Sequence, residues 1–308
     1  MTWHPEAVPD AHGKTVVVTG ANAGVGYFAS EQLAAAGAHV VLACRSQERA
    51  EAAVSAIRRR VPGASVEATP LDVSDHASVA EAAAALLERE RLDVLLLNAG
   101  IVHAPADRAV DARGNELVLS TNVLGHFQLT ALALPVLERT PGARIVTLGS
   151  LATLLAGFPL DDLQLDGTYT SWKAYAQSKI AAQVFGFELD RRLRAAGADI
   201  ASVVVHPGYS TSGRTPGIRG VNQPSKVKRF ADNLQAAWTQ GKDHGAWVPV
   251  RAALDPEVRG GDFLGPRWVT KGVPTRALAT PTTRDRAVGE RVWALLEEYS
   301  GQRFPLGR

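Results

Sequence analysis

The feature that most constrains the fold is a regular alternation between short apolar runs, rich in β-branched residues, and longer alanine-rich segments. The apolar runs are typical of buried strands, and the alanine-rich segments are long enough to form helices. Strands that are apolar on both faces and separated by helices predict a parallel sheet covered on both sides. The predicted strands lie within residues 14–20, 39–44, 65–73, 93–100, 143–150 and 200–208. The predicted helices span residues 26–36, 46–60, 74–91, 116–138 and 172–196.

This alternation continues through the first 208 residues without a linker and without a repeat of fixed period. We therefore expect residues 1–308 to form one α/β domain, with a doubly wound parallel sheet of about seven strands and helices on both faces. Beyond this region, proline, glycine and basic residues become frequent. The elements expected there are helices at 225–240, 245–253 and 283–299 and a final edge strand at 261–265.

Composition limits the kinds of partner that this chain can have. The formal net charge of the 308 residues is +2, which is too small to argue for a nucleic-acid partner. Cys44 is the only cysteine, so no intrachain disulfide can form and a reducing compartment fits. Residues 1–14 lack the apolar core of a signal peptide, and no apolar run reaches the roughly 18 residues of a membrane helix. We therefore expect a cytoplasmic protein with no nucleic-acid partner, no membrane partner and no metal site.

The first predicted strand leads into the sequence TGANAGVG, which places Gly20, Gly24 and Gly26 in the turn before the first helix. Glycines let a ligand approach the backbone closely, and the start of a helix offers free N–H groups and a partial positive charge. Such a turn between a strand and a helix is where the pyrophosphate of a dinucleotide binds in a Rossmann fold. The alternative is a tight turn that holds no ligand.

Five further motifs follow the glycine-rich turn. They are NAG at 98–100, TNVLGHF at 121–127, TLGS at 147–150, YAQSK at 175–179 and HPG at 206–208. In this order, and over about two-thirds of the chain, the six motifs resemble those of the short-chain dehydrogenase/reductase family. The resemblance implies a single-domain Rossmann fold, a nicotinamide cofactor, and oxidation of an alcohol or reduction of a carbonyl compound.

The resemblance also implies that Ser150, Tyr175 and Lys179 are catalytic, with Asn122 holding a water that links the lysine to solvent. The unperturbed pKa of tyrosine is about 10, so the phenol is a poor base near neutral pH. A lysine four residues later lies on the same face of a helix and would favour the phenolate by Coulomb attraction. Ser150 would hydrogen-bond both Tyr175 and the substrate oxygen. Each residue alone has an ordinary structural explanation, and their joint occurrence favours catalysis.

The end of the second predicted strand bears on the choice of cofactor. In NAD-dependent proteins an acidic residue there binds the ribose 2′-hydroxyl, whereas a nearby arginine accommodates the 2′-phosphate of NADP. Here Cys44 occupies the acidic position and Arg45 follows it, and Ser46 could add a hydroxyl contact. We therefore expect NADP(H) to be preferred over NAD(H), and the alternative for Arg45 is a surface arginine with no cofactor role.

Other cofactor contacts follow from the resemblance. Asp72 and Val73 would flank the adenine, and either Thr211 or Ser212 would contact the nicotinamide carboxamide. The complete set of expected cofactor-binding residues is Thr19, Gly20, Asn22, Gly24, Val25, Gly26, Arg45, Ser46, Asp72, Val73, Asn98, Ala99, Gly100, Tyr175, Lys179, Pro207, Gly208, Thr211 and Ser212.

The long segment between Ser150 and Tyr175, together with ACRS and GPRW, resembles the retinol dehydrogenase and protochlorophyllide reductase branch. Protochlorophyllide reductases reduce a carbon–carbon double bond of a pigment, and the resemblance implies a cysteine near the substrate for that reaction. The only cysteine here is Cys44, at the adenosine end, so reduction of a pigment is disfavoured. We expect residues 213–247 to form a substrate lid and residues 248–308 to extend the same domain. The expected substrate contacts are Leu151, Leu154, Tyr169, Trp172 and Tyr209, which favour an apolar or aromatic ketone, aldehyde or alcohol.

Two rival functions use the same fold. A cofactor-binding regulator would keep the glycines and bind NADP(H), but it would have no need of the serine, tyrosine and lysine together. Epimerases, dehydratases and lyases of nucleotide sugars tend to carry a larger C-terminal domain than this chain offers. Family members often pair through the helices expected at 116–138 and 172–196, so a homodimer or homotetramer is expected.

Overall fold

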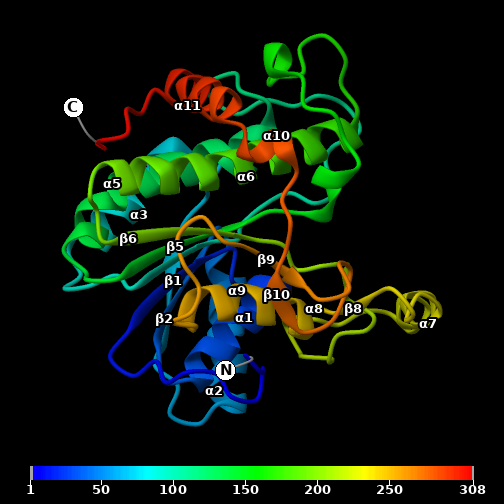
Figure 1. Cartoon of the computed structure of the whole chain (residues 1–308). Helices are drawn as coiled ribbons and strands as arrows, with labels where there is room; N and C mark the ends of the chain where they lie inside the picture. The colour runs from blue at the N-terminus through cyan, green and yellow to red at the C-terminus, as the bar shows by residue number, and fades with distance from the viewer. Residues whose placement is uncertain (1–2, 307–308) are drawn as a thin grey trace.

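The computed structural model describes residues 3–306, with one large sheet between two layers of helices (Figure 1). The strands of this sheet are β1 (Thr15–Thr19), β2 (His39–Cys44), β3 (Val66–Pro70), β4 (Val94–Leu97), β5 (Ala143–Leu148), β6 (Ile200–Val205), β9 (Phe263–Pro266) and β10 (Pro274–Arg276). A separate small sheet pairs β7 (Ser210–Thr211) with β8 (Gln240–Gly241).

The longer helices are α1 (Gly24–Ala35), α2 (Gln47–Arg60), α3 (His76–Leu87), α5 (Gly125–Glu138), α6 (Ser171–Ala195), α7 (Lys226–Leu234), α9 (Trp247–Leu254) and α11 (Arg286–Ser300). Shorter helical turns are α4 (Leu117–Leu119), the π-helical turn η1 (Ser120–Leu124), the 3₁₀ turns η2 (Leu151–Leu154) and η3 (Leu160–Asp162), α8 (Lys242–Gly245) and α10 (Pro281–Arg284).

The strand order in the large sheet is β10-β9-β6-β5-β4-β1-β2-β3. Seven of these strands run parallel, and only β10 is antiparallel to its neighbour β9. The predicted α/β fold with a doubly wound parallel sheet is therefore confirmed. The chain order reverses between β1 and β4, and ligands of open parallel sheets bind beyond the strand ends at such a point.

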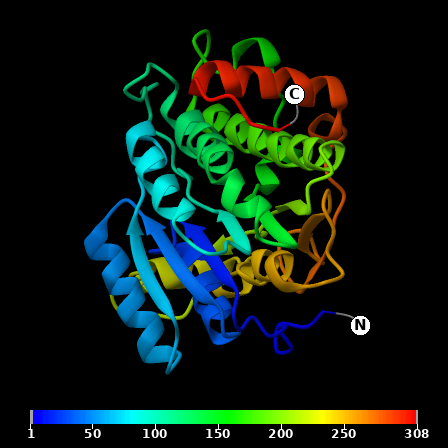
Figure 2. The ribbon, with the colours of Figure 1, turned by 90° about the vertical axis from the view of Figure 1, so that its left-hand side faces the viewer.

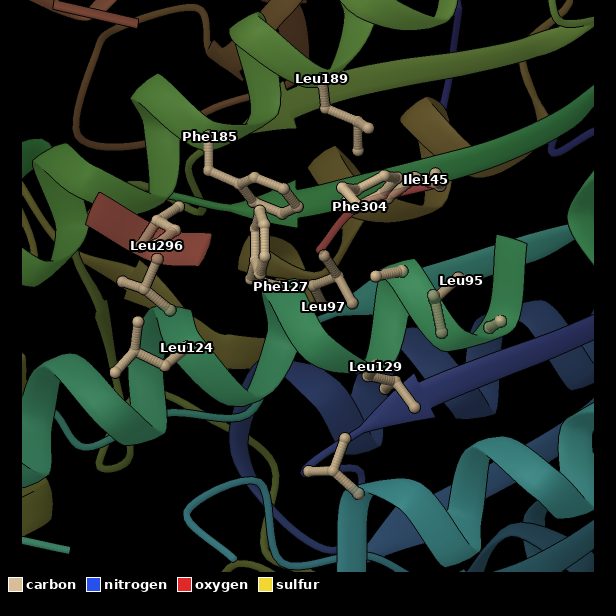
Figure 3. Close-up of a cluster of buried hydrophobic side chains, with 14 of the residues drawn as sticks. Leu95, Leu97, Leu124, Phe127, Leu129, Ile145, Phe185, Leu189, Leu296 and Phe304 are labelled. Atoms are coloured by element: carbon tan, nitrogen blue, oxygen red, sulfur yellow. The ribbon is translucent and has the colours of Figure 1, made fainter. Parts of the chain in front are cut away.

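Two buried apolar clusters lie on opposite faces of the sheet. One joins side chains of α3, α5, α6 and α11, and the other joins side chains of α1, α2 and α9. Figure 2 shows these helical layers on either side of the strands. Phe127 of α5 is the centre of an aromatic group, and its ring centroid lies 5.6 Å from that of Phe185 and 5.4 Å from that of Phe304 (Figure 3). The Trp293 ring centroid lies 5.3 Å from the Phe127 ring centroid. This packing holds α5 and α6 against the sheet, and α6 carries two of the expected catalytic side chains, Tyr175 and Lys179.

Three expected elements differ from the structure. The strand expected at the edge is β9, which lies between β6 and β10, because the antiparallel return strand β10 covers its outer side. The helix expected at 225–240 ends earlier, since α7 stops at Leu234. The helix expected at 116–138 is interrupted by the π-helical turn η1, in which the Gly125 N–H donates to the carbonyl of Ser120.

The continuous helical segment Leu117–Glu138 has a mean hydropathy of 1.4 over its most apolar 18-residue window. It passes a length and composition test for a membrane span, so the expectation that no segment is apolar enough was wrong by this measure. However, 83% of that window is buried inside the described structure. The apolar composition is explained by packing in the core, which makes the segment weak support for a membrane span.

Candidate active site

The glycine-rich turn after β1 lies against the chain that follows β4. Gly20 and Gly24 both have φ of +65°, a conformation that favours glycine. A Cβ atom on Gly20 would lie 2.8 Å from the Ala99 Cα, and one on Gly26 would lie 2.3 Å from the Asn98 Nδ2. Asn98 in turn donates from Nδ2 to the carbonyl of Thr19 at 2.8 Å. The turn is therefore shaped by close backbone contact with the NAG motif.

Thr19 is fully buried and joins both motifs to α5. Its Oγ1 accepts hydrogen bonds from the backbone N–H groups of Asn98 and Ala99, each at 2.9 Å. Its own proton then points to His126, whose Nε2 lies 3.0 Å away. Burial lowers the pKa of His126 to about 4, so the ring is neutral and its Nδ1–H is left to face the carbonyl of Asn122 at 3.3 Å. Thr19 therefore influences the site indirectly, because its hydroxyl group positions Asn98, Ala99 and His126.

The start of α1 fits the phosphates of a dinucleotide. Its N-cap residue Ala23 makes no side-chain capping bond, and no acidic residue lies in the first turn. The backbone N–H groups there have no side-chain acceptor, and a bound anion would accept hydrogen bonds from them. Asn22 and Val25 complete this turn and are partly buried.

The adenosine end carries the residues at the end of β2. The Cys44 side chain is buried, and burial raises the pKa of its thiol to about 11. The Arg45 side chain is 78% exposed, with its Nη1 3.7 Å from the Asp72 Oδ2. Ser46 caps α2 by accepting from the Arg49 N–H at 3.4 Å. Val73 is buried, and its carbonyl lies beneath Gly125.

The expected catalytic side chains come together at the ends of β5 and α6. The Tyr175 hydroxyl donates to the Ser150 Oγ at 3.0 Å, and the Ala152 N–H donates to the same oxygen at 3.1 Å. With both acceptor positions engaged, the Ser150 proton is free to point to a substrate oxygen. Gln183 donates from Nε2 to the Ser150 carbonyl at 3.2 Å and so fixes this turn. This residue was not among the predicted site residues.

Lys179 lies one helical turn after Tyr175 with a side chain that is almost fully buried. Its Nζ donates to the carbonyl of Leu148 at 2.9 Å, and burial lowers its pKa to about 8. A Cβ atom on Gly100 would lie 3.7 Å from this Nζ, so the NAG motif lies directly beside the lysine ammonium group.

The phenol of Tyr175 departs from the expectation that the lysine favours the phenolate. Burial raises the pKa of Tyr175, and the hydrogen bond to Ser150 opposes this rise without cancelling it. Desolvation disfavours the charged form of a group, and it is the largest influence on the pKa of this phenol. The phenol is therefore protonated at neutral pH, which is the state that a proton donor requires.

Asn122 lies in the π-helical turn and is buried. Its Oδ1 accepts from the Ile101 N–H at 2.7 Å, and its Nδ2 donates to the Ser178 Oγ at 2.8 Å. These bonds tie the NAG loop to the helix that carries Tyr175 and Lys179. π-helical turns often occur at functional sites, and the role that the resemblance implied for Asn122 stays a prediction.

The HPG motif places Pro207 and Gly208 at the end of β6, and Gly208 has φ of +69°. Thr211 is buried in β7 beside Asp232, whereas Ser212 is half-buried and its carbonyl accepts from Asn222 at 3.3 Å. The choice between the two hydroxyls as the carboxamide partner stays open.

The five expected substrate residues do not form one group. Trp172 and Tyr209 are about half exposed, and the Trp172 ring lies 6.4 Å from the Tyr175 ring. Tyr169 faces elsewhere, since its hydroxyl donates to the carbonyl of Pro105 at 3.0 Å. Leu151 and Leu154 line a cavity of about 250 Å³ next to Ser150.

The other side of this cavity is formed by residues 263–280, which were not among the predicted substrate contacts. Its other wall is the return between β9 and β10 and the segment that follows, including Phe263, Val269 and Leu278. His206 also lines it, and burial lowers the pKa of this ring to about 4, so that it contributes a neutral polar group. None of the residues of the expected lid, 213–247, lines this cavity.

A family model described as short chain dehydrogenase matches residues 14–219. The chain therefore belongs to the short chain dehydrogenase family, and its fold is that of an oxidoreductase of this class. Within the family it falls in the retinol dehydrogenase-like branch. Human retinol dehydrogenase 13 is 40% identical over 212 residues, covering 68% of this chain and 63% of that protein. Human retinol dehydrogenase 12 is 33% identical over 293 residues, covering 95% of this chain and 88% of that protein.

Solved structures agree with this assignment. A protein of Mycobacterium paratuberculosis described as uncharacterized has a TM-score of 0.80 and 33% sequence identity, covering 99% of this chain and 100% of that chain. A short chain dehydrogenase from Burkholderia cenocepacia, solved in complex with NADP, has a TM-score of 0.62 and 25% identity, covering 82% of this chain and 96% of that chain.

Proposed function

We propose that this protein is an NADP(H)-dependent reductase of apolar ketones or aldehydes, with Tyr175 as the proton donor. The observation that carries the proposal is the hydrogen bond of 3.0 Å between the Tyr175 hydroxyl and the Ser150 Oγ, beside the buried Lys179. A regulator that only binds the cofactor would not need these three side chains together. The same reaction in reverse would oxidise the corresponding alcohol.

When bound, NADP(H) would supply the hydride, and the protein must then hold the carbonyl oxygen and deliver a proton to it. The free proton of Ser150 would orient the oxygen, and the Tyr175 phenol would protonate it. Lys179 would stabilise the phenolate that remains until the proton is replaced. Asn122, held by Ile101 and Ser178, would keep the path from the lysine to water in place.

The proposed preference for NADP(H) rests on two residues at the end of β2. Arg45 offers a planar guanidinium group to the 2′-phosphate, and Cys44 stands where NAD-dependent proteins have a carboxylate. We expect wild type to prefer NADPH in kcat/KM, and Arg45→Ala to lose roughly tenfold or more with NADPH but little with NADH. Arg59→Ala at the exposed end of α2 is the matched control. A preference of the wild type for NADH would contradict this assignment.

The substrate would enter the cavity beside Ser150, whose walls are mainly apolar. Its volume of about 250 Å³ is below the roughly 300–1,000 Å³ typical of sites for drug-sized ligands, so a compact apolar group fits. Trp172 and Tyr209 would contact the part of the substrate outside the cavity. We propose that residues 213–247 form a lid over this outer part of the substrate. We also propose that residues 1–308 form a single domain.

Leu154→Trp should reduce kcat/KM for bulky apolar ketones by roughly tenfold and leave small aldehydes unaffected, because the larger side chain narrows the cavity. Leu155→Trp is a close control, since Leu155 is 76% exposed and does not line the cavity. Steady-state kinetics over a series of ketones of increasing size would measure the difference. Equal effects of the two variants would place the substrate elsewhere.

The function itself is tested by NADPH oxidation with a panel of aromatic, terpenoid, steroid and polyketide-like ketones and aldehydes. Turnover by the wild type identifies a reductase. Tight NADPH binding without turnover of any member would favour the cofactor-binding regulator. We also propose a cytoplasmic protein that forms a homodimer or homotetramer, which cell fractionation and light scattering would check.

A further inference from the structure

Lys242 lies outside all the family motifs, yet its ammonium group lies beside the glycine-rich turn. A Cβ atom built on Gly24 would have the Lys242 Nζ as its nearest neighbour, at 4.0 Å. Gly24 begins α1 and belongs to the turn where the pyrophosphate is proposed to bind. The lysine therefore approaches this turn from the C-terminal half of the chain.

The backbone around Lys242 is fixed to the elements that form the turn. The Lys242 N–H donates to the Thr215 Oγ1 at 2.8 Å, and the preceding residue, Gly241, pairs with Thr211 in the small sheet. Gln32 of α1 donates from Nε2 to the carbonyl of Asp243 at 2.9 Å. The helix that would bind the phosphates thus holds the segment that carries the lysine.

The Lys242 ammonium has no anionic partner among the residues that the structure describes. The carboxylate that raises its pKa, that of Asp232, is already bonded to the Gly213 N–H at 2.7 Å and to the Lys228 Nζ at 2.5 Å. Burial, and then the like charge of Lys228, lower the pKa of Lys242 below its usual value. A partly buried cation without an anion is unfavourable, and here it faces a helix start that also lacks an acceptor.

We propose that Lys242 is a cofactor-binding residue whose ammonium group neutralises the pyrophosphate of the dinucleotide. The proposal rests on the function proposed above and adds a residue to it. Lysine binds a phosphate as a point charge and needs no fixed geometry, which suits a side chain that reaches across from another element. Its role differs from that of Arg45, because the pyrophosphate is common to NADP and NAD.

Lys242→Met should weaken the binding of NADPH, NADH and ADP-ribose alike, each by roughly tenfold at low salt. All three contain the pyrophosphate, whereas 2′-AMP does not, and its affinity should stay at the wild-type value. Titration calorimetry on the purified full chain measures these four dissociation constants without turnover. Lys242→Arg keeps the charge and should retain most of the affinity, and Lys226→Met on the exposed start of α7 is the matched control.

Unchanged NADPH and ADP-ribose affinities in Lys242→Met would overturn the proposal. Weaker binding of 2′-AMP as well would also overturn it, since the variant would then disturb the site as a whole. A melting temperature near that of the wild type excludes unfolding, and Lys242→Gln offers a second neutral variant if the methionine destabilises the chain. Failure of the wild type to bind any of the dinucleotides would refute the proposed function, and this inference with it.

Discussion

Tyr175→Phe is expected to reduce kcat for carbonyl reduction by about 10²- to 10⁴-fold and to leave the dissociation constant for NADPH close to that of the wild type. The phenol is the proposed proton donor, and burial raises its pKa, so the wild type holds the proton at neutral pH. Phenylalanine keeps the ring and removes only the hydroxyl. Stopped-flow or steady-state NADPH oxidation gives kcat, and fluorescence titration gives the dissociation constant.

Tyr169→Phe provides the matched control for this variant. It removes the same hydroxyl group from a tyrosine whose partner is the carbonyl of Pro105, away from Ser150. We expect its kcat to remain near that of the wild type. If Tyr175→Phe turned over at a comparable rate, the proton would have to come from another group, and the assignment of Tyr175 would be wrong.

Gly125→Ala is expected to lower the free energy of unfolding by about 3 kcal/mol or more. A Cβ atom on Gly125 would lie 1.8 Å from the Val73 carbonyl oxygen. The obstacle is backbone rather than the end of a flexible side chain, so the start of α5 must move away from the loop before α3. Urea unfolding followed by circular dichroism measures the loss.

The control is Gly157→Ala, because a Cβ atom there has no neighbour within 4 Å and the backbone φ is not in the positive range. This variant should unfold within about 0.5 kcal/mol of the wild type. Equal stability of Gly125→Ala and Gly157→Ala would show that α5 can shift at little cost. The displacement would then be expected at Asn122, one turn before Gly125 on the same helical segment.

The parallel sheet could be predicted because its strands carry their own signal. Val16, Val17 and Val18 are apolar on both faces of β1, and that pattern has few alternatives once helices separate the runs. The last strands were harder, since β9 and β10 are short and contain glycine and proline. β9 enters the sheet by pairing with β6, which lies far away in the sequence, and β10 is attached only through β9.

The site shows the same division between local and distant information. Ser150 and Tyr175 could be paired from their motifs, and the structure brings them into hydrogen-bond contact. His126 gave only a weak signal, a histidine four residues after Asn122 in an apolar helix, and Lys242 gave none. Their partners, Thr19 and the glycine-rich turn, lie far away in the sequence, and only the folded chain brings them together.

Helix α7 attaches to the body with its polar side, since Asp232 is its only buried residue and accepts a hydrogen bond from the Gly213 N–H. Val227, Phe230 and Leu234 face solvent, with exposed fractions of 77%, 67% and 69%, on a helix at the margin of the molecule (Figure 1). An outward displacement of α7 would therefore uncover little new apolar surface. Because the heat capacity of a conformational change follows the apolar area exposed, such a displacement would have a small heat-capacity change and a nearly temperature-independent enthalpy.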